Sequence, residues 1–153
     1  MTDTSTEAAV PRPRPTEEEP QSGRAAERSR TWPLTLLRVT SLLFLFDTLF
    51  QAALAGLFIT GDVRFLDLHA ANAQLVAVIA LVEAVAALLV WRATRGPAWP
   101  FALAAGLVVL VGAQMWLGAA RLLGGHVPLA LGVFGTGVAL ACWACTYQGR
   151  EAG

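Results

Sequence analysis

The chain has 153 residues, of which 56% are hydrophobic and 14% charged, and its formal net charge at pH 7 is zero. Soluble domains carry about a quarter charged residues, so this composition excludes an ordinary soluble domain and indicates a membrane protein. The zero net charge provides no basic surface for nucleic acid. All eleven basic residues are Arg, which excludes lysine chemistry, and two late cysteines exclude a disulfide framework.

Residues 1–30 are rich in Pro, Glu, Arg and Ser and almost lack large apolar side chains. Such a segment cannot bury enough surface to offset the entropy lost on ordering, so we expect a disordered tail. The segment is too polar for a signal peptide, and the apolar run behind it is longer than the core of one. We therefore expect the first apolar run to remain as a membrane anchor.

Four apolar segments follow this tail, each close to the roughly 20 residues that cross the hydrocarbon core of a bilayer. We expect transmembrane helices over residues 34–60, 69–91, 98–121 and 127–147. Short connections make consecutive helices antiparallel neighbours. The predicted fold is all-α: a transmembrane up-and-down four-helix bundle over residues 31–148, followed by a short C-terminus at residues 149–153.

The arginines predict the orientation of this bundle, because positive residues accumulate on the cytoplasmic side of a membrane. Most of them lie on the side of the two chain ends: Arg24, Arg28, Arg30, Arg38, Arg92, Arg95 and Arg150. Within the bundle region, only Arg64 and Arg121 lie on the opposite side. We expect a multi-pass protein of the inner (cytoplasmic) membrane, with the tail and the C-terminus in the cytoplasm.

A short pattern occurs twice in the chain. Residues 51–72 read QAALAGLFITGDVRFLDLHAAN, and residues 114–129 read QMWLGAARLLGGHVPL. Each stretch begins with Gln-x-x-Leu near the end of one predicted helix and carries a His at the start of the next. His69 and His126 are the only histidines. The pattern predicts two tandem hairpins, related by an axis along the membrane normal, that place both histidines at nearly the same depth.

Two histidines on alternate helices at matched depth can face one cavity of the bundle, and neutral imidazole binds haem iron well. Gln-x-x-Leu-Gly from Gln114 and His-x-x-Leu-Ala from His126 resemble the second hairpin of a half-bundle of haem A synthase. That family has two four-helix halves, each with a His pair on its second and fourth helices. Residues 31–148 also resemble small uncharacterised bacterial four-helix membrane proteins and the membrane domains of b-type cytochromes.

This resemblance implies that His69 and His126 would bind one b-type haem near the outer face. The chain departs from haem A synthase, because it is a single half-bundle and has Leu66 where that family has a carboxylate before its first His. It also lacks a cysteine pair in the outer loops. The resemblance therefore implies electron transfer or haem handling rather than synthesis, and nothing in the sequence indicates an enzyme.

Other residues near the outer end are candidates to assist such a haem. Arg64 and Arg121 could pair with its propionates, and Asp67 or the outer glutamines, Gln51 and Gln114, could orient a ring nitrogen. Two alternatives stay open for the histidines. They could bind zinc together with Asp62 and Asp67, or they could be hydrogen-bonded residues that bind no cofactor.

Asp47 and Glu83 lie inside the first and second apolar segments, roughly 20 Å from the outer ends of their helices. A carboxylate that faces lipid is costly, so both should face the interior of the bundle. They could serve as hydrogen-bonding groups between helices or handle protons or cations. The Cys142-Trp-Ala-Cys145 stretch fits the packing role that cysteine often has.

Three functions follow from these residues. The first is a haem protein with a membrane redox partner. The second is a proton- or cation-coupled transporter or channel subunit that uses Asp47 and Glu83 and assembles as a homo-oligomer. The third is a non-catalytic membrane scaffold whose tail, residues 1–30, binds a partner. The lipid bilayer is an expected partner in all three.

Overall fold

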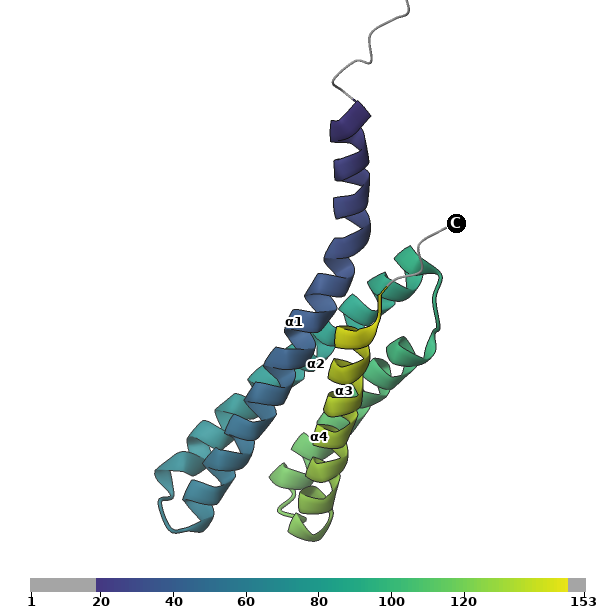
Figure 1. Ribbon diagram of the computed structural model, residues 1–153. Helices are drawn as coiled ribbons and strands as arrows, with labels where there is room; N and C mark the ends of the chain where they lie inside the picture. The colour runs from purple at the N-terminus through teal and green to yellow at the C-terminus, as the bar shows by residue number, and fades with distance from the viewer. Residues whose placement is uncertain (1–18, 149–153) are drawn as a thin grey trace, which may run out of the picture.

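A computed structural model of the protein describes residues 19–148, with side chains from Trp32 onward. This part of the chain folds into four helices and contains no strand (Figure 1). The helices are α1 (Glu19–Ile59), α2 (Arg64–Thr94), α3 (Trp99–Ala119) and α4 (Leu123–Thr146). Each contains an apolar segment long enough to cross a membrane. The expected all-α fold of an integral membrane protein is confirmed.

Some helix ends differ from the expected positions. Helix α1 begins at Glu19, so residues 19–30 of the expected tail belong to this helix. Pro20 falls in the first turn, where a missing N–H removes no helical hydrogen bond. Helix α2 begins at Arg64, before the expected start of the second span, which places His69 in the second turn. The remaining tail and residues 149–153 lie outside the described range.

The four helices form a ring in which α1 and α3 each contact both α2 and α4. In the described residues, the backbones of α1 and α3 are not neighbours, nor are those of α2 and α4, so these pairs are diagonal. Figure 1 shows the α1–α2 and α3–α4 hairpins side by side at one end and apart at the other. We call the end with the turns at residues 60–63 and 120–122 the histidine end, and the opposite end the terminal end.

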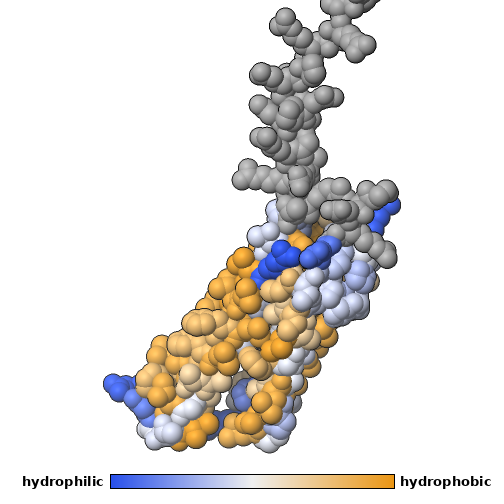
Figure 2. Space-filling model, in the orientation of Figure 1, coloured by the Kyte–Doolittle hydropathy of each residue, from blue (hydrophilic) through white to orange (hydrophobic). Residues whose placement is uncertain are grey.

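The buried core fills only the half of the bundle nearer the terminal end. Its largest apolar side chains include Leu37, Phe44, Leu107 and Leu140. Toward the histidine end, Val76, Val111 and Val133 are the last buried residues described on α2, α3 and α4, and α1 adds only Leu54 beyond Asp47. Figure 2 shows a hollow between the two hairpins at this end. The hairpins therefore diverge where the histidines lie.

The two hairpins bury equivalent residues. When His69 is aligned with His126, every buried residue of α4 matches a buried residue of α2: Val76 with Val133, Ala80 with Gly137, Glu83 with Leu140, Ala84 with Ala141, and Ala87 with Ala144. When Gln51 is aligned with Gln114, three of the buried residues of α3 match buried residues of α1: Leu37 with Pro100, Ser41 with Ala104, and Phe44 with Leu107. The packing thus follows the tandem repeat expected from the sequence.

Arg38 joins α1 to the end of α4 at the terminal end. Its Nε donates a hydrogen bond to the backbone oxygen of Ala144 at 2.8 Å, and its Nη2 donates to that of Tyr147 at 2.9 Å. Carbonyls in the last turn of a helix have no helical partner, so a guanidinium is a suitable donor for them. Arg38 therefore also has a structural role in closing the ring of helices.

Candidate functional site

Gln51 and His69 hold α1 and α2 together through two reciprocal hydrogen bonds. The Nε2 of Gln51 donates to the backbone oxygen of His69 at 2.9 Å, and Nδ1 of His69 lies 3.1 Å from the backbone oxygen of Gln51. Because a carbonyl oxygen only accepts, Nδ1 carries the proton of the second bond. In the neutral imidazole, Nε2 then keeps a free lone pair, which is what a metal ion binds.

Gln114 and His126 form the same arrangement between α3 and α4. The Nε2 of Gln114 donates to the backbone oxygen of His126 at 2.9 Å, and Nδ1 of His126 lies 3.0 Å from the backbone oxygen of Gln114. The partners are 18 residues apart in the first hairpin and 12 in the second, yet the bonds are the same. We call each arrangement a Gln–His clasp. The recurring Gln…His pattern of the sequence encodes these two clasps.

A small residue next to the ring permits the second clasp. A Cβ on Gly118 would lie 3.0 Å from Cε1 and 3.3 Å from Nδ1 of His126. Such contacts are shorter than ordinary van der Waals separations, so a side chain here would push the ring away from α3. Gly118 follows Gln114 by one helical turn, and in the first hairpin Ala55 holds the corresponding position after Gln51.

The two imidazoles approach each other across the interior of the bundle. The ring centroids of His69 and His126 are 6.4 Å apart, and the ring planes are inclined by 67°. Two imidazoles that bind one metal ion from opposite sides, through bonds of about 2 Å, have centroids about 6 Å apart. Both rings are half-buried, and the Phe58 ring lies edge-on to His69 at 5.4 Å. The spacing therefore fits a shared metal centre.

The first clasp continues into a polar chain that runs deeper into the bundle. Nδ2 of Asn72 donates to Oε1 of Gln51 at 2.9 Å, and the Asn72 side chain also lies next to the Asp47 carboxyl. Asp47 is 7% exposed, and its Oδ2 is buried without a partner in the described part of the chain. A continuous chain of polar groups thus connects Asp47 with the clasp of His69.

The second clasp has no such extension. Leu110 and Leu129 stand at the positions equivalent to Asp47 and Asn72. The Oε1 of Gln114 is accordingly buried without a hydrogen-bond partner among the described residues. The two hairpins therefore share the Gln–His clasp but differ next to it, where the first has polar residues and the second has leucines.

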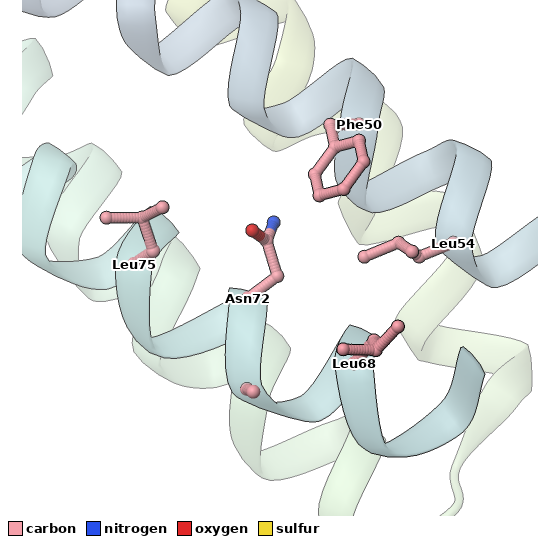
Figure 3. A pocket seen from close by; sticks show the side chains of 6 residues that line it. Phe50, Leu54, Leu68, Asn72 and Leu75 are labelled. Carbon is pink, nitrogen blue, oxygen red and sulfur yellow. The ribbon is translucent and has the colours of Figure 1, made fainter. Parts of the chain in front are cut away.

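A groove of about 280 Å³ runs along the seam between α1 and α2 at the level of Asn72. Figure 3 shows the Asn72 side chain extending from α2 toward α1, among apolar side chains of both helices. The residues that line the groove are Phe50, Leu54, Leu68, Ala71, Asn72 and Leu75. Asn72 is the polar member of this set. The groove therefore reaches the polar side chains that adjoin His69.

Glu83 lies deeper, in the packed half of the bundle, and is completely buried. Oγ of Ser41 donates to its Oε1 at 2.6 Å, whereas Oε2 has no partner among the described residues. No hydrogen bond described here joins Glu83 to either clasp. Asp47 and Glu83 thus both face the interior but differ in surroundings, since only Asp47 is connected to a histidine.

The charged residues expected to assist a haem are exposed at the histidine end. Arg64 forms an ion pair with Asp62, with Nη2 and Oδ2 2.8 Å apart, and its side chain is 85% exposed. Hydrogen bonding to Arg64 holds the pKa of Asp62 below its usual value. Arg121 and Asp67 are also exposed. Of the two expected groups, Asp67 or an outer glutamine, it is the glutamines whose backbone oxygens lie within hydrogen-bond distance of the Nδ1 atoms.

The alternative zinc site is not assembled in the described part of the chain. No group of three or more His, Cys, Asp or Glu residues there could hold a metal ion, and Asp62 is bound to Arg64. Cys142 and Cys145 are free and exposed near the terminal end of α4, far along the helix from His126. A ligand set of two imidazoles therefore remains, which suits haem iron better than zinc.

Comparison with known proteins adds no identification. The chain matches no protein family, no curated protein and no solved structure.

Proposed function

We propose that this integral membrane protein binds one b-type haem between His69 and His126, for electron transfer or haem handling. The observation that carries this proposal is the pair of identical Gln–His clasps. They leave both Nε2 atoms free to bind a metal and hold the ring centroids 6.4 Å apart. One clasp alone would be an ordinary interhelical contact, but with two clasps on diagonal helices His69 and His126 could both hold one iron.

The unfilled histidine end supports the same proposal. Protein interiors are normally close-packed, yet beyond Val76, Val111 and Val133 the described parts of α2, α3 and α4 bury no residue. The half-buried residues one turn from the clasps include Ala55, Ala73 and Leu129, which are small or apolar. A flat apolar macrocycle would occupy the space between the hairpins and cover these surfaces. By the arginine distribution, this end faces the outer side of the inner membrane.

The residues of the chain have distinct roles in this proposal. His69 and His126 would hold the iron, while Gln51 and Gln114 fix the ring orientation and keep each proton on Nδ1. Gly118, which has no side chain, allows the His126 ring to pack against α3. A haem held in this way supplies one-electron chemistry. Arg64 and Arg121 are exposed at the histidine end. Their side chains would have to turn inward to pair with haem propionates.

The test is an absorption spectrum of the detergent-purified protein from haem-supplemented cells, oxidised and then reduced with dithionite. We expect a Soret band, with α and β bands that sharpen on reduction, and their loss or strong shift in His69→Ala and His126→Ala. Gln74→Ala is the matched control, because Gln74 is exposed on the same helix as His69. A protein that stays colourless even after titration with haem would refute the proposal.

A proton- or cation-coupled transporter subunit is the second candidate. It is favoured by the buried oxygens Asp47 Oδ2 and Glu83 Oε2, which lack partners in the described structure although they lie within apolar helices. Proteoliposomes containing a pH-sensitive dye would test it. This candidate predicts transport that Asp47→Asn or Glu83→Gln abolishes and that the histidine substitutions leave intact. A haem protein that transports nothing predicts no dye response in the wild type or in any of these variants.

A further inference from the structure

The two hairpins differ in one respect that bears on the histidine site. Behind His69 the polar chain runs through Gln51 and Asn72 to the buried carboxyl of Asp47. Behind His126 the corresponding positions are Leu129 and Leu110, so the second clasp ends at an unpartnered oxygen. Asp47 is thus an ionisable group next to the His69 clasp that has no counterpart next to the His126 clasp.

We propose that Asp47 takes up one proton when a haem bound between His69 and His126 is reduced. This inference rests on the proposed haem function and adds to it a coupling between electron and proton. One electron from an external reductant such as dithionite would convert Fe(III) to Fe(II). One proton from the aqueous phase converts the Asp47 carboxylate to the carboxylic acid. The net charge of the site then stays constant.

Electrostatics gives the reason for the coupling. An oxidised iron with two neutral imidazoles and a porphyrin carries one excess positive charge, and reduction removes it. A carboxylate near that charge is stabilised in the oxidised state and loses this stabilisation on reduction. Within an apolar bundle the effective dielectric constant is low, so the difference is larger than at a surface. The position of Asp47, about one helical turn from Gln51, puts it within range of this effect.

The other ionisable groups near Asp47 are few. From α2, the inward-facing groups in the described structure are His69, whose Nδ1 proton is bound to the Gln51 carbonyl, and Glu83, which is bound to Ser41. From α4, the inward-facing ionisable group is His126. On α1 itself, Arg38 is held by carbonyls at the terminal end. Among these groups, only Asp47 combines an unpartnered oxygen with a neighbour, Asn72, that is bonded to a clasp.

A route for the proton is also present. Asn72 is half-buried, and between its level and the histidine end Leu54 of α1 is the one buried side chain in the described structure. Water that enters the histidine end therefore needs to cross no layer of buried side chains on α2, α3 or α4 to approach Asn72. Glu83 lies below that layer, inside the packed half, and is completely buried.

The test is a potentiometric titration of the haem absorption bands at a series of pH values, on the full-length haem-loaded protein. The midpoint potential of the wild type should fall as pH rises, approaching about 59 mV per pH unit for one proton per electron. Asp47→Asn should remove most of this slope, because an amide stays neutral in both states. Glu83→Gln, the matched control, should keep the wild-type slope.

A second variant covers the case in which Asp47→Asn does not fold. Asp47→Leu combined with Asn72→Leu copies the residues of the second hairpin, and it should also give a potential that is nearly independent of pH. A wild-type potential that does not change with pH, or a slope that survives both Asp47 variants, would overturn the inference while leaving haem binding intact. Absence of any haem spectrum would overturn both proposals, so the two failures are distinguishable.

Discussion

Gln51 and His69 each use a backbone carbonyl to accept a hydrogen bond from the side chain of the other. This exchange orients the imidazole without help from a charged group and places a proton on Nδ1, so that in the neutral ring Nε2 keeps its lone pair. Because Gln114 and His126 repeat it, the bundle contains two histidines that are held in the same way on diagonal helices.

The two glutamines should contribute unequally to stability. Gln114→Leu removes one side-chain hydrogen bond, which should lower the free energy of unfolding in micelles by about 1 kcal/mol. Gln51→Leu removes the bond to His69 and also leaves Asn72 without its acceptor, so its loss should be larger. Unfolding titrations with sodium dodecyl sulfate would measure both. Equal losses, or a larger one for Gln114→Leu, would contradict this description of the first clasp.

Gly118 should be essential for the second ligand. Gly118→Val places branched carbons where a Cβ alone already lies 3.0 Å from His126, so the ring should be displaced and haem affinity should fall at least about tenfold. Gly112→Val on the same helix is the control, because a Cβ there meets nothing within 4 Å. Haem titrations followed at the Soret band would compare them. Equal affinity in the two variants would show that the ring of His126 does not depend on this contact.

The Ser41–Glu83 pair should be replaceable as a unit. Ser41→Ala alone leaves a completely buried carboxyl without its donor, which should cost about 1–3 kcal/mol of unfolding free energy. The double variant Ser41→Ala, Glu83→Leu copies the equivalent pair of the second hairpin, Ala104 and Leu140, and should recover most of this loss. The same unfolding titrations would decide. A double variant no more stable than the single one would argue that Glu83 contributes more than packing.

Gly137 should be required for the close approach of α4 to α1. A Cβ at this position would lie 2.8 Å from Cδ1 of Phe44, so Gly137→Ala should destabilise the bundle by about 1–3 kcal/mol through overpacking. Gly135→Ala, where a Cβ meets nothing within 4 Å, should be neutral or slightly stabilising because alanine favours helix. Thermal unfolding of the two variants would separate these outcomes. Similar behaviour of both would imply that α1 can move aside.

Much of the fold could be predicted from the sequence, because hydropathy and length determine transmembrane helices in a chain with so few charges. The helix count, the antiparallel order and the inward position of Asp47 and Glu83 all follow from these patterns. The extension of α1 back to Glu19 could not be predicted. Composition argues for a disordered segment there, whereas a continuing helix needs no apolar partner once a long span has nucleated it.

The site could be predicted only in part. The repeated Gln…His pattern indicated that the two histidines belong together, but not that each glutamine would act through both its side chain and its backbone carbonyl. The role of Gly118 and the pairing of Ser41 with Glu83 depend on distances between helices. Only packing determines such distances. Arg64 was expected near a propionate, yet its nearest carboxylate along the chain, Asp62, binds it in the turn.

The most direct test of the account is to ask whether both histidines bind the same haem. The visible spectrum of the haem-loaded wild type should be that of a six-coordinate, low-spin haem. His69→Gly and His126→Gly should each give a five-coordinate, high-spin spectrum, and added free imidazole should restore the low-spin form in both. A wild-type spectrum that is already high-spin, or one that changes in only one of the two variants, would contradict the shared site.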